Sequence, residues 1–352
     1  MNRFEYVRPA SVQEAVTAAS QPGSVYLAAG TNLLDLMKLG AARPERVIDI
    51  TRLPGLGEID WRPDGSVRIG AMVRNSDLAY DERFARTFPV VAEALLSGAS
   101  AQLRNAATVG GNLMQQTRCA YFQDVASACN RRAPGSGCDA REGENRLHAV
   151  LGWSESCIAT HPSDFCVPLV ALDAVTEVAG PNGMRDVAID ALHALPGETP
   201  ERETALQPGE LITALKLPSD AAAFADHARY LKVRERTSFA FAVVSAAAAL
   251  RIDGGKIQSA RLALGGVAAK PWRARDAEAV LENAPPTQEA FAKAAELALS
   301  EARPSGKNAF KIELARRLIV RALSLSTEGT PEAMPALPAS PFATVPSANH
   351  AR

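Results

Sequence analysis

The sequence lacks any run of roughly 18 apolar residues, so no helix is expected to span a membrane. It also lacks net charge, because 38 Lys and Arg offset 39 Asp and Glu to leave −1. A near-neutral chain gives no electrostatic reason to expect nucleic acid or an anionic membrane surface as a partner. The opening MNRFEYVRPAS has no apolar signal region. If the protein is exported, we therefore expect a partner to carry it.

Two familiar motifs are missing. Without GxGxxG, the ordinary dinucleotide-binding fold is not expected. The cysteines show neither the C-x2-4-C pairs of structural zinc sites nor a short-spaced ferredoxin pattern. Five cysteines is an odd number, which argues against a simple disulfide framework. No Ser/His/Asp set or paired carboxylates can be argued from spacing.

What is present is typical of a globular protein with a sizeable core. The chain has 352 residues, of which 47% are hydrophobic and 22% charged, and this length favours two or three domains. We predict an α+β fold, because strand–helix alternation comes first and strands followed by helices come last. The predicted segments are an α/β unit at 1–60, a second unit at 61–226 with an insert at about 115–162, an α+β domain at 227–326, and an extended or disordered tail at 327–352.

The first unit is organised around a glycine turn. A buried strand at Val25–Ala28 runs into Gly30, and a helix opens at Thr31 or Asn32. A second buried strand follows at Arg46–Ile50. A strand–helix–strand order of this kind predicts a parallel pair joined by a crossover.

Further along, Leu78–Leu96 is predicted to be helical with a break at Pro89, and ATVGGNL to be a short strand that ends in a glycine pair. The third domain is expected to contain long strands and then helices at Gln288–Glu301 and Phe310–Ser324.

Two loops are candidates for phosphate binding, AAGTNLL around Gly30 and ATVGGNL around Gly110 and Gly111. Glycine lets a backbone approach a ligand closely, and N–H groups at a helix start favour anions. Either loop alone also fits a plain turn. Two such loops with Asn and Thr beside them favour a pyrophosphate held from both sides.

The insert holds four of the five cysteines, Cys119, Cys129, Cys138 and Cys157, in the spacing C-x9-C-x8-C-x18-C. They lie among polar residues, where nothing apolar needs filling. Four thiolates on such a loop suit a [4Fe–4S] cluster, with nearby arginines to offset its charge. Zinc, disulfides and idle thiols all stay open at this point.

Other polar residues near the insert have plain structural interpretations. His148 and His161 are expected to be hydrogen-bonded structural residues, although either type can bind metal. Asp164 is by default the cap of the following helix, and Lys232 a solvated base. Cys166 precedes an apolar run and is expected to be a buried thiol.

These motifs together resemble the FAD-binding (medium) subunits of the molybdenum hydroxylases, the xanthine dehydrogenase and carbon monoxide dehydrogenase family. The resemblance covers nearly everything from Phe4 to Ser326, including AAGTNLLDLMK, RNAATVGGNLM, KVRERTSFAFAVVSAAAAL and LALGGVAAKPWRA. It implies a two-part FAD-binding domain that is unlike a Rossmann fold, followed by a smaller C-terminal domain. The cysteine insert resembles the version found in periplasmic aldehyde oxidoreductases of enteric bacteria, whose FAD subunit also holds a [4Fe–4S] cluster.

The resemblance implies roles for individual residues. The cluster ligands would be Cys119, Cys129, Cys138 and Cys157. Asp164 and Lys232 would contact the flavin side. The residues that would cradle the FAD pyrophosphate and ribityl chain are Leu27, Ala28, Ala29, Gly30, Thr31, Asn32, Leu33, Leu34, Thr108, Gly110, Gly111 and Asn112.

The implied role is electron transfer within a heterotrimer. A molybdopterin-containing large subunit would oxidise aldehydes to carboxylic acids, and a small subunit with [2Fe–2S] clusters would pass electrons to FAD in this chain. Co-export would place the complex in the periplasm, whereas without co-export the enzyme would be cytoplasmic. Two different functions stay open. One is the FAD/[4Fe–4S] subunit of a hydroxybenzoyl-CoA reductase-like or xanthine dehydrogenase-like complex, and the second is a zinc-bearing docking subunit.

Overall fold

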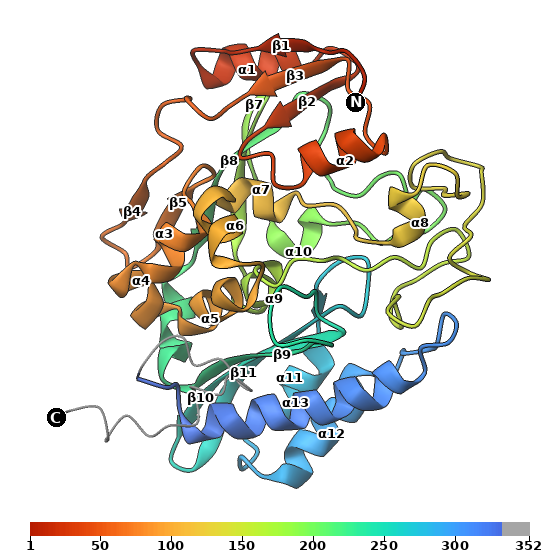
Figure 1. The fold of residues 1–352 in the computed structure, drawn as a ribbon. Helices are drawn as coiled ribbons and strands as arrows, with labels where there is room; N and C mark the ends of the chain where they lie inside the picture. Colours follow the sequence, from red (N-terminus) through yellow and green to blue (C-terminus); the bar gives the residue numbers. More distant parts are fainter. Residues whose placement is uncertain (333–352) are drawn as a thin grey trace, which may run out of the picture.

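The computed structural model describes residues 1–332 and arranges them around three sheets that follow one another along the chain (Figure 1). The three-stranded sheet lies at one end, the five-stranded sheet in the middle and the four-stranded sheet at the other end. Within these described residues, no helix is both long and apolar enough to cross a membrane. The mixture of helices and sheets confirms the predicted α+β class.

The first sheet is parallel, as the strand–helix–strand order predicts. Its elements are β1 (Glu5–Val7), α1 (Val12–Ala19), β2 (Ser24–Leu27), α2 (Leu33–Leu39) and β3 (Arg46–Asp49). The strand order is β1-β3-β2, and β3 pairs in parallel with both neighbours. Helix α2 begins directly after Asn32, so the Gly30 turn joins the end of β2 to the start of α2.

The middle sheet is antiparallel, with strand order β4-β5-β8-β6-β7. Its strands are β4 (Ile59–Trp61), β5 (Val67–Gly70), β6 (Val175–Gly180), β7 (Gly183–Ala188) and β8 (Leu211–Leu217). The helices of this part are α3 (Asn75–Tyr80), α4 (Glu82–Thr87), α5 (Pro89–Ser97), α6 (Ala101–Ala106), α7 (Val109–Leu113), α8 (Ala120–Gln123), α9 (Cys166–Ala171), α10 (Ile189–Leu192) and the 3-10 helix η1 (Ser219–His227). Pro89 starts α5, where its missing N–H costs nothing, so the predicted break is confirmed.

The predicted strand in ATVGGNL is wrong, because these residues form helix α7. The Thr108 hydroxyl accepts a hydrogen bond from Gly111 N–H and so caps the helix. The backbone N–H of Gly110 donates to Ala71 O at 2.8 Å, which holds α7 against the end of β5. A Cβ at Gly110 would lie 2.9 Å from Ala71 Cβ, so this close approach requires glycine.

The third sheet has the order β12-β11-β10-β9 and is antiparallel. Its strands are β9 (Ala228–Val233), β10 (Val244–Asp253), β11 (Lys256–Gly265) and β12 (Trp272–Arg273), and its helices are α11 (Arg275–Leu281), α12 (Gln288–Ala298) and α13 (Phe310–Glu328). Helix α13 crosses the bottom of the molecule in Figure 1, and its first turns lie toward the loops of the insert. The two helices predicted after the strands are confirmed.

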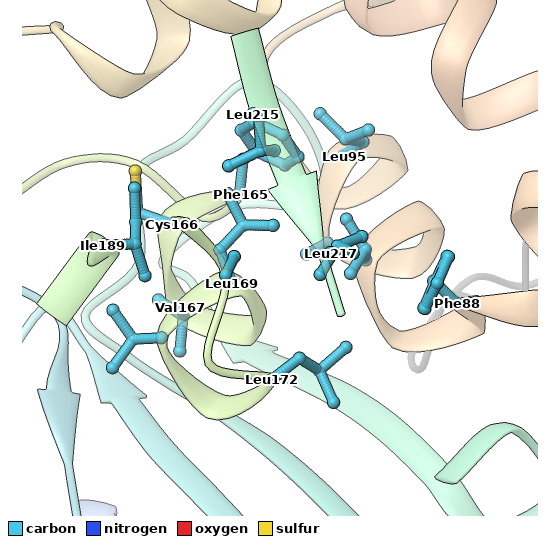
Figure 2. Packing of buried hydrophobic residues seen from close by; sticks show 14 of the residues in the cluster. Phe88, Leu95, Phe165, Cys166, Val167, Leu169, Leu172, Ile189, Leu215 and Leu217 are labelled. Carbon is cyan, nitrogen blue, oxygen red and sulfur yellow. The ribbon is translucent and has the colours of Figure 1, made fainter. Parts of the chain in front are cut away.

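A hydrophobic core joins the middle sheet to its helices (Figure 2). Leu215 and Leu217 of β8 face Leu95 of α5 and Leu169 of α9 in this core. Cys166, at the start of α9, is 0% exposed, so the prediction of a buried core thiol is confirmed. This packing fixes the position of α9 and therefore that of the residues just before it, which line the cleft described below.

The structure differs from the predicted tail at 327–332. Helix α13 continues to Glu328, since Ser326 is fully buried against β10 and keeps the last turn packed. Beyond the helix, Thr330 N–H donates to Asp226 O at 2.7 Å. The rest of the predicted tail, 333–352, lies outside the described residues. The predicted domain boundaries stay predictions.

Candidate functional site

A cleft of about 500 Å³ lies where the two glycine loops meet. That volume is within the range of small-molecule and cofactor pockets. Gly30 has φ of 74°, and a Cβ there would meet the Leu34 side chain at 2.7 Å. The turn therefore requires glycine both for its backbone conformation and for its packing.

The two glycine loops adjoin and are tied together. A Cβ at Gly111 would lie 3.9 Å from Ala28 Cβ, which sets α7 beside the end of β2. The backbone N–H of Gln116 donates to Asn32 Oδ1 at 2.8 Å. Asn32 Nδ2 is buried and has no hydrogen-bond partner within residues 1–332. An orphaned donor at the start of helix α2 suits a polar, anionic ligand such as a pyrophosphate.

Most of the predicted loop residues line this cleft. They are Ala28, Ala29, Gly30, Thr31, Asn32, Leu33, Thr108, Gly110 and Gly111. Three others support it from outside its lining. Leu27 and Leu34 pack against Gly30, and Asn112 Oδ1 accepts from Ser163 Oγ at 2.8 Å.

Asp164 and Lys232 form a buried ion pair that lies outside the cleft lining. Lys232 Nζ is 2.7 Å from Asp164 Oδ2, and the Tyr230 hydroxyl donates to Asp164 Oδ1 at 2.6 Å. The default interpretation of Lys232 as a solvated base is wrong, because its side chain is 3% exposed. Asp164 does not cap α9 either, since Ser163 Oγ accepts from Cys166 N–H instead. Their contact with a flavin stays a prediction.

All four insert cysteines line one narrow cavity of about 10 Å³, beside the cleft. Burial raises the pKa of Cys119 and Cys138, and nearby backbone N–H groups, of residues 121 and 122 for Cys119 and of residues 140 and 158 for Cys138, lower it in part. Cys157 Sγ accepts from Ala159 N–H at 3.5 Å. Such bonds favour the thiolate, although burial raises the pKa of Cys119 to about 11. Metal binding here would therefore release protons.

The cysteine sulfurs are spaced too widely for one zinc ion. Within residues 1–332, no three of these four sulfurs lie within 4.8 Å of one another. Four thiolates at about 2.3 Å around tetrahedral zinc would be only roughly 3.8 Å apart. As placed, the four sulfurs therefore do not form a zinc-sized ligand shell. A simple disulfide is also absent among the described residues, where all five cysteines are free.

A second group, His161, Cys166 and His193, has its ligand atoms within 4.8 Å of one another. The protonation pattern favours a neutral histidine pair over a metal. His161 Nδ1 accepts from Ser163 N–H, which leaves the proton on Nε2. His193 Nε2 donates to Leu113 O, which leaves Nδ1 as an acceptor. His161 Nε2 is then a buried donor and His193 Nδ1 a buried acceptor, neither with a hydrogen-bond partner within residues 1–332, and burial lowers the pKa of both rings.

His148 lies against the cysteine cavity. Its Nε2 is 3.3 Å from Cys119 Sγ. Burial, with Lys311 as a second cause, lowers its pKa to about 4, so the ring is neutral at physiological pH. This agrees with the expected structural role.

The cleft and the cysteine cavity share a wall made by Thr117 and Arg131, which line both. The Thr117 hydroxyl donates to Thr160 O at 3.0 Å, so the insert leaves the fold and returns to it at adjoining points. Arg131 pairs with Glu203 across the cleft edge.

Several cleft residues carry no local sequence signal. Arg131 and His161 belong to the insert, whereas His193, Glu203 and Thr204 come from the segment between α10 and β8. This segment follows an unrelated strand pair in the sequence. Only the strand order of the middle sheet brings it to the cleft.

Two adjoining glycine loops at a cofactor-sized cleft, on a non-Rossmann α+β fold, fit a flavoprotein subunit of the molybdenum hydroxylase class. The model of the FAD binding domain in molybdopterin dehydrogenase matches residues 2–220. That of the CO dehydrogenase flavoprotein C-terminal domain matches residues 229–325. The chain belongs to this family of FAD-binding subunits. The predicted fold type and the prediction of a FAD-dependent oxidoreductase subunit are thereby confirmed.

The similar proteins agree with this membership. The chain is 48% identical over 326 residues to the aldehyde oxidoreductase FAD-binding subunit PaoB of Escherichia coli (strain K12), covering 92% of this chain and 98% of that one. It is 30% identical over 331 residues to the carbon monoxide dehydrogenase medium chain of Hydrogenophaga pseudoflava, covering 92% and 96%. A solved structure of the Hydrogenophaga pseudoflava carbon monoxide dehydrogenase superposes with a TM-score of 0.72 at 29% identity, covering 93% and 98%.

Proposed function

We propose that this chain is the FAD and [4Fe–4S] electron-transfer subunit of a heterotrimeric, molybdenum-dependent aldehyde oxidoreductase. The observation that carries the proposal is the four-cysteine cavity next to the flavin cleft, with a shared wall between them. The likeness to an aldehyde oxidoreductase subunit at 48% identity supports the aldehyde as substrate class.

The residues present fit both groups. The Gly30 loop would hold the FAD pyrophosphate with backbone N–H groups at the start of α2, the glycines of the second loop would let the ligand approach closely, and Asn32 Nδ2 offers a buried donor. Cys119, Cys129, Cys138 and Cys157 would hold the cluster through their thiolates, and Cys157 Sγ already accepts a backbone hydrogen bond. Holding a cluster in the narrow cavity would require these side chains to rotate outward.

The chain's part in the reaction is to bind, orient and shield. When bound, FAD would take up the two electrons released as an aldehyde and water become a carboxylic acid and two protons, and would deliver them to an external acceptor. The oxidation itself belongs to a molybdopterin-containing large subunit, and a [2Fe–2S] small subunit would supply the electrons. We place the complex in the periplasm by co-export, which cell fractionation would test.

The test is an absorption spectrum of the purified chain, with iron and acid-labile sulfide measured on the same sample. We expect flavin bands, a broad visible shoulder, and about four iron and four sulfide per chain. Cys157→Ser is expected to lose the iron and keep the flavin. Cys166→Ala is the matched control, because this thiol is buried in the core outside the cavity.

Flavin without iron in the native chain would remove the cluster from the proposal and leave the family intact. A colourless protein with zinc would support the docking subunit instead. Aldehyde must also reduce the flavin only when the sister subunits are present, and reduction by aldehyde of this chain alone would refute the division of labour.

A further inference from the structure

Arg131 stands in the wall between the flavin cleft and the cysteine cavity. It lines both spaces, and its side chain is only 6% exposed. Burial lowers the pKa of Arg131, but Glu203 and, on the cavity side, Cys157 of the same lining outweigh this and raise it. On the cleft side its charge reaches His161, whose pKa is lowered mainly by burial and additionally by His193 and Arg131.

Glu203 holds this guanidinium in place. Its Oε1 is 3.2 Å from Arg131 Nη1 and also accepts from Gln116 Nε2 at 3.3 Å. Gln116 is in turn tied to Asn32 of the phosphate loop. The polar chain therefore runs from the flavin loop to a cysteine of the insert, through groups taken from three separate segments.

The ion pair does not use all of the guanidinium. Arg131 Nε is buried and has no hydrogen-bond partner within the described chain, 1–332. A buried cation normally has its donors satisfied, because an unmade bond costs the full desolvation of the group. An orphaned donor in a wall between two spaces points to a group in one of them.

We propose that Arg131, oriented by Glu203, is a charge shared by the two sites and sets the reduction potential of both the flavin and the cluster. The inference deepens the proposed function and rests on it. Arg131 acts through space as a positioning and electrostatic residue and is not itself a reactant.

The direction of the effect follows from charge. Each electron added at either site adds negative charge, and a fixed cation in a poorly solvated wall stabilises that reduced state. At an effective dielectric constant of about 20 and a separation of about 10 Å, one unit charge changes a one-electron equilibrium roughly tenfold. Removing Arg131 must lower both potentials, and removing the Glu203 carboxylate must raise both.

The experiment is a potentiometric titration of the full chain purified with its cofactors, with absorption for the flavin and electron paramagnetic resonance for the cluster. For Arg131→Gln we expect both potentials to fall by about 59 mV, the equivalent of a tenfold change in a one-electron equilibrium. For Glu203→Gln we expect both to rise. Opposite shifts from the two partners of one ion pair are not produced by simple loosening of the structure.

Arg132→Gln is the matched control. This neighbouring arginine carries the same charge on the same loop but lines neither space, since its guanidinium donates to the carbonyls of Tyr121 and Phe122. It must leave the flavin potential unchanged. An equal flavin shift in this variant would overturn the specific role of Arg131.

Three further results would overturn the inference: an unchanged flavin potential in Arg131→Gln, a shift in only one cofactor, or shifts of the same sign in Arg131→Gln and Glu203→Gln. If Arg131→Gln does not retain its cofactors, the proposal is tested with Glu203→Gln alone. A flavin potential that does not rise in Glu203→Gln then refutes the proposal. Iron and sulfide are measured on the native chain first. A native chain without iron overturns the cluster assignment and the shared role, whereas both cofactors with unshifted potentials overturn this inference alone.

Discussion

Lys311 is a fully buried lysine that joins helix α13 to the cysteine insert. Its Nζ donates to Leu147 O at 2.9 Å, His148 O at 2.8 Å and Gly266 O at 2.6 Å. Two of these carbonyls belong to the insert, and the third follows β11. Lys311→Met keeps most of the side-chain volume and removes all three donors, so it tests how strongly this one group braces the insert.

The magnitude follows from two opposing contributions. Burial lowers the pKa of Lys311 from 10.5 to about 7. At about 1.4 kcal/mol per pH unit, burying the charge costs roughly 5 kcal/mol. Three hydrogen bonds from a charged donor contribute about 1.5–3 kcal/mol each, or roughly 5–9 kcal/mol together. The balance of these two contributions is about 0–4 kcal/mol, and Met also leaves three buried carbonyls without a donor, so we expect Lys311→Met to lower the free energy of unfolding by about 2–4 kcal/mol.

The assay is chemical denaturation of the full chain near neutral pH, with amide hydrogen exchange of residues 141–160 measured alongside. Exchange in the insert should speed up, because its carbonyls lose their anchor. Lys307→Met is the control, since this lysine also reaches the insert, at Glu144, but is 69% exposed. Its loss should cost at most about 1 kcal/mol. A Lys311→Met chain as stable as Lys307→Met, with unchanged exchange, would refute the reasoning.

The same lysine predicts a pH dependence. Its pKa in the folded chain is lower than in the unfolded chain, so between about pH 7 and 10.5 the unfolded chain binds more protons. Stability from this group therefore rises with pH. The stability difference between the native chain and Lys311→Met should widen from about pH 7 to about pH 9, and a difference that narrows would contradict the sign.

The remaining predictions concern the cleft and the pair behind it. Gly30→Ala places a Cβ at positive φ and 2.7 Å from Leu34, so we expect the purified chain to lose most of its flavin absorbance. Gly57→Ala, where a Cβ meets nothing within 4 Å, should keep it, and equal flavin content in both would count against the loop assignment. Tyr230→Phe removes the hydroxyl that donates to Asp164 and should cost about 1–3 kcal/mol in denaturation, because the carboxylate is buried. An unchanged midpoint would show that this bond contributes no net stability.

Helices and strands that depend on the sequence of a single short segment could be predicted. The strand, Gly30 turn and helix of the first unit follow from hydrophobic period and glycine placement, and the break at Pro89 from proline chemistry. Helix α7 was wrongly predicted as a strand, although the sequence contains a helix-capping residue, Thr108, directly before it. The two glycines argued against a helix, because glycine has a low helix propensity. In the folded chain the close contact of Gly110 with Ala71 compensates for this low propensity.

Contacts between distant segments could not be predicted. Lys311 belongs to a charged helical stretch that would be predicted to face solvent. In the structure it is buried, and it donates to carbonyls about 45 and 163 residues away in the sequence. Likewise, the sequence around Lys232 does not predict its ion pair with Asp164, and the sequence around Arg131 does not predict its ion pair with Glu203. Such pairs are set by strand order and packing, which a local window does not contain.

The insert closes on itself at its base, where the Thr117 hydroxyl meets Thr160 O. The chain on either side therefore takes nearly the same path whether the intervening segment is long or short. Because lengthening a closed loop costs little extra entropy, the length of such a segment can vary while the chain enters and leaves it at the same place. The four cysteines therefore lie in a segment whose length is not fixed by the sheets on either side of it.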